Sequence, residues 1–192
     1  MNRTYLTRIE LASALARGVR QLVFIGAGET TTEAPTTHAS GGSLRLFAVD
    51  EQEPLAPMVT FVPTRFESEE LSAALSRSNF DRLKTSLFIW FGDATYRTMD
   101  AALSTLSFIA SLPEGSGVIF DYAAERSSLG SFAGTALDAL ASRVWCAGGA
   151  VKHLIQPQAV AAMLRGLGFG HMADHSDEDL FPLDRHIVSA LV

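Results

Sequence analysis

Short apolar runs alternate along the chain with longer stretches in which apolar residues recur at helical spacing. The runs at 21–25 and 85–91 contain no charged side chain, which is typical of strands buried on both faces of a parallel sheet. Between two such runs, Met99, Leu103 and Leu106 recur at intervals of three or four residues, which predicts an amphipathic helix. The pattern predicts strands at 21–25, 44–49, 58–62, 85–91, 117–122, 169–173 and 186–192, and helices at about 5–17, 68–75, 98–111, 130–144 and 157–164.

This order of elements predicts a doubly wound α/β fold. Five strands separated mostly by helices, followed by a late strand–loop–strand, indicate a mostly parallel, seven-stranded sheet with a C-terminal antiparallel hairpin. The acidic stretch 174–179 is expected to be the loop of that hairpin, and residues 1–192 are expected to form one domain. In such sheets, ligands bind over the carboxyl ends of the strands.

Composition and charge narrow the choice of partner. Apolar residues make up 47% of the chain, the net charge is −6 and the isoelectric point is about 5.3. No basic run is present, which argues against nucleic acid, and no apolar run approaches the ~20 residues that span a bilayer. A single cysteine, Cys146, and no recognisable signal peptide suit a reducing cytoplasm. We therefore expect a soluble cytoplasmic protein with a small-molecule ligand.

A glycine turn follows the first predicted strand. Gly26, Ala27 and Gly28 allow close approach of a ligand to the backbone, and Asp50 ends the second predicted strand about twenty residues later. This arrangement is typical of sites that hold a nucleotide-type cofactor, in which the acid contacts ribose hydroxyls. A helix usually follows such a turn, but here the stretch 30–42 is rich in Thr, Ser, Gly and Pro and is expected to be a loop.

Candidate acid–base residues follow the fourth and fifth predicted strands. Asp93 and Tyr96 come just after the fourth strand, and Asp121 and Tyr122 end the fifth. A carboxyl group beside a phenol can transfer protons if burial raises the pKa of the acid. The alternative is that Asp93 caps the following helix while Tyr96 packs beneath it.

We expect no metal site. His171 and His175 lie near several acids, but a strand that passes into a loop would not place residues four apart on one face.

Five segments carry a resemblance to a known family. Taken in order, the residues at 14–28, 47–50, 87–96, 108–122 and 161–169 resemble the leucine carboxyl methyltransferase family. The nearest branch is that of the small-molecule O-methyltransferases found in polyketide pathways and actinobacteria. The resemblance implies a class I methyltransferase fold, a role in natural-product biosynthesis and S-adenosylmethionine (SAM) as cofactor. It also implies that Gly26, Ala27, Gly28 and Asp50 contact SAM.

The chain departs from this family at polar positions. Where the family turn reads G-A-G-L-D-T-R, residues 26–32 of this chain have neither the aspartate nor the arginine. Arg65 and Phe66 stand where the family has an acid and a phenylalanine, and Phe91 replaces the glutamate that precedes Gly92. By the resemblance, these four residues line the cofactor site. Since losing one buried hydrogen-bonded partner costs roughly 1–3 kcal/mol, we expect SAM binding to be weak or lost.

The family also has a long N-terminal helical segment over its site, most of which this chain lacks. We therefore expect an exposed apolar crevice at Phe66, Trp90 and Phe91, partly covered in a homodimer.

Three functions remain open at this point. The first is a SAM-dependent O-methyltransferase, which the glycines and Asp50 favour. The second is a SAM-independent enzyme that uses the same fold for proton transfer, cyclisation or isomerisation. The third is a non-catalytic partner subunit. The changed polar positions favour the second and third.

Overall fold

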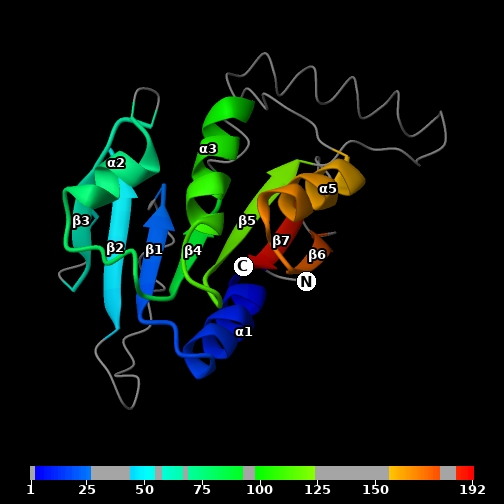
Figure 1. The fold of residues 1–192 in the computed structure, drawn as a ribbon, viewed down its shortest axis with the longest axis horizontal. Coiled ribbons are helices and arrows are strands. Elements are labelled where there is room, and N and C mark those ends of the chain that lie inside the picture. Colours follow the sequence, from blue (N-terminus) through cyan, green and yellow to red (C-terminus); the bar gives the residue numbers. More distant parts are fainter. Residues whose placement is uncertain are drawn as a thin grey trace.

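The computed structural model describes residues 3–26, 44–54, 58–66, 69–92, 98–123, 156–177 and 185–192. The predicted helix at 130–144 and Cys146 lie outside these residues. Figure 1 shows the elements, which in chain order are α1 (Arg3–Ala16), β1 (Gln21–Ile25), β2 (Arg45–Asp50), β3 (Thr60–Pro63), α2 (Leu71–Ser76), β4 (Ser86–Trp90), α3 (Met99–Ala110), β5 (Gly117–Ala123), α5 (Pro157–Leu167), β6 (His171–Asp177) and β7 (Arg185–Leu191).

One seven-stranded sheet has the order β3-β2-β1-β4-β5-β7-β6. The pairs among β1 to β5 are parallel, whereas β7 is antiparallel to both β5 and β6. Of the described strands, β7 alone is therefore reversed, and β6 runs in the direction of β1 to β5. The chain reverses its winding between β1 and β4, which are neighbours in the sheet. The predicted doubly wound fold with a C-terminal antiparallel hairpin is confirmed.

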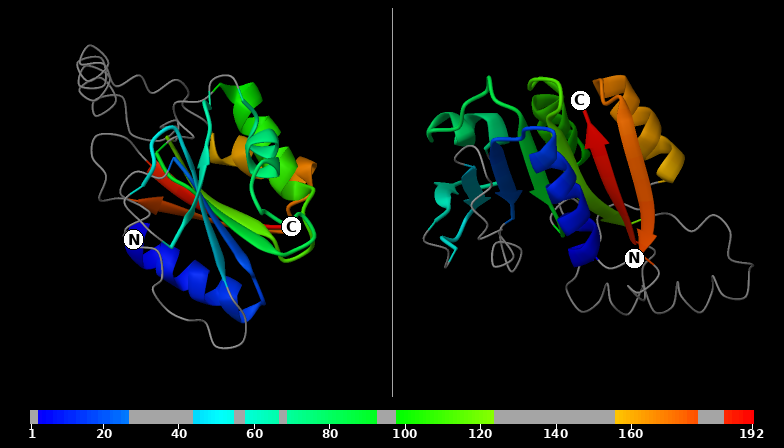
Figure 2. Two further views of the ribbon diagram at one scale, coloured as in Figure 1. Left: turned by 90° about the vertical axis from the view of Figure 1, so that its left-hand side faces the viewer. Right: turned by 90° about the horizontal axis from the view of Figure 1, so that it is seen from below.

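The two faces of the sheet are covered by different helices, as Figure 2 shows from the side. Alternate strand residues such as Val23, Phe88 and Val118 form a core cluster with side chains of α2, α3 and α5. Their sequence neighbours Leu22 and Leu87 face the other way, toward α1. Both faces of the central strands are thus buried, which explains why these strands are uninterrupted apolar runs rather than alternating ones.

The hairpin differs from its predicted form. Strand β6 continues to Asp177, which pairs with Arg185 of β7, so the residues from Asp174 to Asp177 belong to a strand and not to an acidic loop. His171 and His175 consequently lie on one strand four residues apart, a spacing that places them on one face. Pairing with β7 outweighs the low strand propensity of these polar residues.

None of the helices in the described part of the chain is long and apolar enough to cross a membrane.

Candidate functional site

The carboxyl ends of β1, β2 and β3 are joined by backbone hydrogen bonds. Gly26 N donates to Val49 O (3.0 Å), and Thr64 N donates to Asp50 O (3.0 Å). Gly26 has a φ of 69°, in the left-handed region that glycine adopts without strain. The three strands therefore end side by side, and the chain turns away from β1 at a residue without a side chain.

Asp50 lies at this edge of the sheet, as predicted for a ribose-binding acid. Its Oδ1 accepts from the backbone N–H groups of Glu51 (2.6 Å) and Gln52 (3.4 Å). These bonds fix the turn that follows β2. Since they occupy Oδ1, Oδ2 is the oxygen that could accept a ribose hydroxyl.

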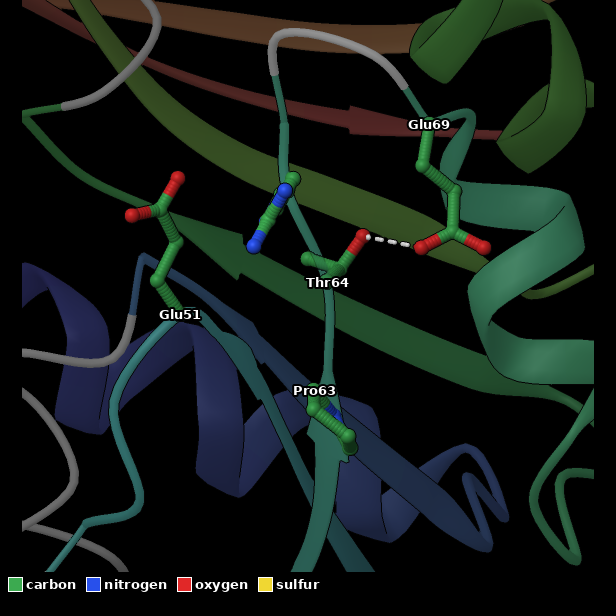
Figure 3. Close-up of a pocket in the computed structure, with 5 residues that line it drawn as sticks. Glu51, Pro63, Thr64 and Glu69 are labelled. Atoms are coloured by element: carbon green, nitrogen blue, oxygen red, sulfur yellow. Dashed lines mark hydrogen bonds between the residues drawn. The ribbon is translucent and has the colours of Figure 1, made fainter.

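An open pocket lies beside Asp50, at the ends of β2 and β3. Its volume is about 720 Å³, and it is lined by Glu51, Pro63, Thr64, Arg65 and Glu69 (Figure 3). Ligand pockets typically have volumes of ~300–1,000 Å³. The pocket is therefore large enough for a nucleoside, and it brings the predicted residue Arg65 to the same edge as Asp50. Sequence reasoning missed Glu51 and Glu69 as site residues, although the position of Glu51 just after the second predicted strand could have indicated it.

Glu69 lines one side of this pocket and is held there by hydrogen bonds. Thr64 Oγ1 donates to Glu69 Oε2 (3.0 Å), and Arg77 donates to both oxygens of the same carboxylate. Arg77 also donates to Pro63 O (3.0 Å), at the end of β3. The hydrogen-bonded guanidinium of Arg77 holds the pKa of Glu69 below its usual range. Glu69 is thus an ionised carboxylate already engaged by neighbouring residues, whereas Glu51 is exposed on the other side of Thr64.

Asp121 is a buried carboxyl near the carboxyl end of β5. Its side chain is only 1% exposed, and Oδ1 accepts from Gly92 N at 2.6 Å. Gly92 has a φ of 77°, so Asp121 stabilises the turn that follows β4. Of the residues predicted from the resemblance, Gly92 therefore does lie at the carboxyl edge of the sheet.

Asp121 and Tyr122 do not pair with each other, because successive residues of a strand point to opposite faces. Tyr122 O–H instead donates to Asp174 Oδ2 at 2.7 Å. Asp174 Oδ1 lies 2.8 Å from His186 Nδ1, and the rings of Tyr122 and His186 are 5.4 Å apart at an interplanar angle of 39°. We call Tyr122, Asp174 and His186 the Tyr–Asp–His cluster.

The cluster joins three strands, with β7 lying between β5 and β6 (Figure 1). Sequence reasoning missed Asp174 and His186 as site residues. His186 could have been identified only if the antiparallel register of β5 and β7 had been known, because that register places His186 opposite Tyr122.

The expected apolar crevice is also not present as predicted. Trp90 is 1% exposed and Phe91 is 6% exposed. Trp90 packs in the core cluster on the α3 side and Phe91 in the one on the α1 side. Phe66 is partly buried against the α3-side cluster. Trp90 and Phe91 are core residues because successive residues at the end of β4 point to opposite faces of the sheet, and both faces are covered. Phe66, which follows β3, packs against the first of these clusters. The homodimer therefore stays a prediction without an exposed aromatic patch to support it, and light scattering that gives a monomer at micromolar concentration would refute it.

Four predicted site residues, Ala27, Gly28, Asp93 and Tyr96, lie outside the described residues. Among the described residues, no group of three or more histidine, cysteine or acidic side chains could hold a metal ion.

The strand order, the single reversed strand and the edge at which the polar residues gather define a class I SAM-dependent methyltransferase fold. A SAM-dependent methyltransferase from Archaeoglobus fulgidus is similar at 13% identity, with a TM-score of 0.60 and coverage of 100% of this chain and 95% of that one. The SAM-dependent methyltransferase SibL, solved in its apo form, is similar at 16% identity, with a TM-score of 0.56 and coverage of 96% of this chain. A structure described as a pericyclic reaction enzyme is similar at 13% identity, with a TM-score of 0.57 and coverage of 95% of this chain.

The chain spans about half the length of two of these structures, 54% of SibL and 47% of the pericyclic enzyme. At this level of identity the similarities show the fold alone. No protein-family model matches the chain, and no curated protein matches it. The resemblance to the leucine carboxyl methyltransferase family therefore stays a prediction.

Proposed function

We propose that this chain is a methyltransferase-like protein of the small-molecule carboxyl or O-methyltransferase type, related to the leucine carboxyl methyltransferases, whose SAM site is weakened. The observation that carries the proposal is the pocket of about 720 Å³ beside Asp50. It lies over the carboxyl ends of β2 and β3, at the edge of the sheet where ligands bind in doubly wound folds.

The described residues fit the nucleoside part of SAM. The pocket has the volume of a small-ligand site, Asp50 Oδ2 would accept a ribose hydroxyl, and Glu51 and Arg65 would face the adenosine. When bound, SAM supplies an activated methyl group, so the protein's main task would be to position the acceptor. Residues 27–43, which include Ala27 and Gly28 of the glycine turn, lie outside the described part of the chain.

Weak binding is expected because polar groups at the pocket already have partners. Glu69 is held by Arg77 and Thr64, and Asp50 Oδ1 is held by two backbone N–H groups. Together with the changed residues Arg65 and Phe91, this leaves few polar side chains to hold a cofactor. We expect a dissociation constant for SAM at or above ~100 µM, or about −5.5 kcal/mol.

Isothermal titration with SAM and with S-adenosylhomocysteine tests this proposal. Glu51→Gln, inside the pocket, should weaken whatever binding is measured. Glu53→Gln removes a nearby exposed carboxylate that does not line the pocket, and it should leave the binding unchanged. A low-micromolar constant, or SAM that copurifies with the protein, would refute the weakened site and support an ordinary methyltransferase. Equal effects of the two variants would place the ligand elsewhere.

A second function is favoured by one specific observation, the Tyr–Asp–His cluster. This function is a SAM-independent enzyme that carries out proton transfer, cyclisation or isomerisation on a natural-product-like small molecule. Its support is an acid–base group at the carboxyl edge of the sheet together with a fold similar to that of the pericyclic reaction enzyme. Turnover of such a substrate without SAM, and its loss in a correctly folded His186→Gln variant, would establish this function. Turnover that depends on added SAM would exclude it.

A further inference from the structure

The edge of the sheet opposite the pocket carries a concentration of positive charge. Arg20 N donates to Thr85 O (3.1 Å), and Arg45 N donates to Arg20 O (3.0 Å). The residues that precede β1 and β4 therefore lie beside the first residue of β2, where these parallel strands begin (Figure 1). The residues gathered there form what we call the basic edge patch: Arg20, Arg45, Asp81, Arg82, Leu83 and Lys84. We propose that this patch docks an acidic segment of a partner protein, with Leu83 as its apolar contact.

The loop that precedes β4 is fixed to the start of β1. The buried side-chain amide of Gln21, the first residue of β1, donates to Asp81 O (2.8 Å) and accepts from Asp81 N (2.8 Å). Within the loop, Leu83 N donates to Asp81 Oδ1 (3.0 Å), and Lys84 N donates to Asp81 O (3.2 Å). The aspartate thus closes a tight turn, and a buried group attaches this turn to the sheet.

Leu83 extends from this turn into solvent. The residue is 87% exposed, the highest value among the large hydrophobic residues in the described part of the chain. A single exposed leucine is ordinary on a protein surface, but this one is held out by an ordered turn between Arg82 and Lys84. An apolar centre with a polar and charged rim is the usual composition of a protein–protein interface.

The patch has the opposite sign of charge to the protein as a whole. Asp81 is its one acid, with Oδ2 3.9 Å from Arg45 Nη2 and 3.8 Å from Lys84 Nζ. Four cations and one carboxylate give a local charge of +3, whereas the whole chain has a net charge of −6. Counting Glu114, exposed on the neighbouring turn before β5, lowers the local charge only to +2. Carboxylates are therefore attracted to this edge although the net charge of the protein repels them.

The guanidinium groups of the patch are already positioned by the protein. Arg82 lies over the ring of Phe108, with its Cζ 5.1 Å from the ring centroid, and donates to Ser111 Oγ (3.3 Å). Arg45 donates to Asn79 O. Since a guanidinium has five N–H donors, both side chains keep N–H groups for a carboxylate oxygen after these bonds. Their fixed positions lower the entropic cost of docking.

An acidic protein segment fits this surface better than a phosphate polymer does. The cations lie on and beside the loop that bears Leu83, and a segment with both carboxylates and an apolar side chain can contact both. A nucleic acid would contact the cations alone, and its dense negative charge would meet the net charge of −6 at long range. The contact area is small, so we expect weak binding that salt reduces. The inference does not depend on the nucleoside site, which lies at the opposite edge.

Fluorescence anisotropy with an acidic peptide tests the proposal. The probe is a fluorescein-labelled peptide made of repeated Glu-Glu-Leu units, which should bind the wild-type protein at ~20 mM salt and lose most of this binding at ~500 mM. Arg20→Glu should weaken the binding at least about fivefold. Arg8→Glu makes the same change of charge at an exposed residue of α1 outside the patch, and it should leave the binding unchanged.

Two further measurements test the role of Leu83 and the location of the probe. Leu83→Ser should weaken binding about threefold, whereas a peptide with serine in place of its leucines should bind this variant and the wild type equally. Nitrogen-15 NMR should show the amide signals of Leu83 and Lys84 shifting when the peptide is added. Circular dichroism checks that each variant is folded.

Several results would overturn the proposal. These are no binding of the peptide to the wild-type protein, equal losses in Arg20→Glu and Arg8→Glu, and NMR shifts confined to residues outside the patch. Tighter binding of an oligothymidylate with the same net charge as the peptide would instead make this edge a nucleic-acid surface. An unchanged constant in Leu83→Ser would refute the apolar contact.

Discussion

Replacing Gly117, at the first position of β5, by alanine should damage the fold directly. A Cβ atom at this position would lie 2.5 Å from Ala190 O and 2.6 Å from Leu191 Cδ2. Both atoms belong to β7, the partner of β5. Because the nearer one is a backbone carbonyl oxygen inside the sheet, it cannot move aside as a flexible side chain could. One of the two strands would have to shift.

The expected change in the free energy of unfolding follows from two opposing effects. Forcing an extra carbon into a packed interior costs about 1–3 kcal/mol, and a backbone contact favours the upper part of that range. Replacing glycine by alanine returns about 0.4–1 kcal/mol by restricting the unfolded chain. We therefore expect Gly117→Ala to lower the free energy of unfolding by about 2 kcal/mol.

Gly166 is the matched control, since a Cβ added there meets no atom within 4 Å and the residue lies within helix α5. Gly166→Ala should raise the free energy of unfolding by about 0.5–1 kcal/mol. Urea unfolding followed by circular dichroism would measure both variants. If Gly117→Ala were as stable as Gly166→Ala, the close approach of β5 and β7 would be refuted.

Three further predictions concern the site and its support. Asp50→Ala should weaken binding of S-adenosylhomocysteine by about 1.5–3 kcal/mol, because the charge-assisted bond to ribose is lost; an unchanged constant in calorimetry would place the nucleoside elsewhere. Since bonding to Arg77 lowers the pKa of Glu69 from 4.5, the stability from this pair is present above pH 4.5 and is lost as the pH falls through the lowered value. Glu69→Gln should therefore lose less stability than the wild type below pH 4.5, as acid titration of the unfolding midpoint would check. Gln21→Leu should destabilise the protein by about 2–3 kcal/mol in urea, because the buried amide bonds both the N–H and the C=O of Asp81; a neutral effect would contradict this support of β1.

The central sheet was predictable because its sequence signals and its packing agree. The segment 21–25 was expected as a buried strand from its apolar run and is β1 (Gln21–Ile25). A helix was expected at about 157–164, and α5 begins at Pro157 and continues to Leu167, with Gly168 as its C-cap residue. In each case the residues locally favour the same secondary structure that packing in the fold requires.

The hairpin and the site were harder to predict because their structure depends on distant partners. From Asp174 to Asp177 the residues have the composition of a solvated loop, and only pairing with β7 makes them a strand. Trp90 and Phe91 were expected in an exposed crevice, but both are buried. An uninterrupted apolar run does not show whether either face of its strand is exposed to solvent. Asp121 and Tyr122 are adjacent in sequence, yet their hydrogen-bond partners are Gly92 and Asp174.

The reversed direction of β7 explains how the Tyr–Asp–His cluster arises near the carboxyl end of β5. In a parallel strand, only residues near the carboxyl end reach that edge, and residues at the start lie at the opposite one. Because β7 is antiparallel, its second residue, His186, lies beside the last residues of β5. A slip of one residue in this pairing would turn His186 to the opposite face from Tyr122 and separate it from Asp174. The close approach at Gly117, which permits alignment of β5 with β7, is therefore also a condition for the Tyr–Asp–His cluster at the other end of the same two strands.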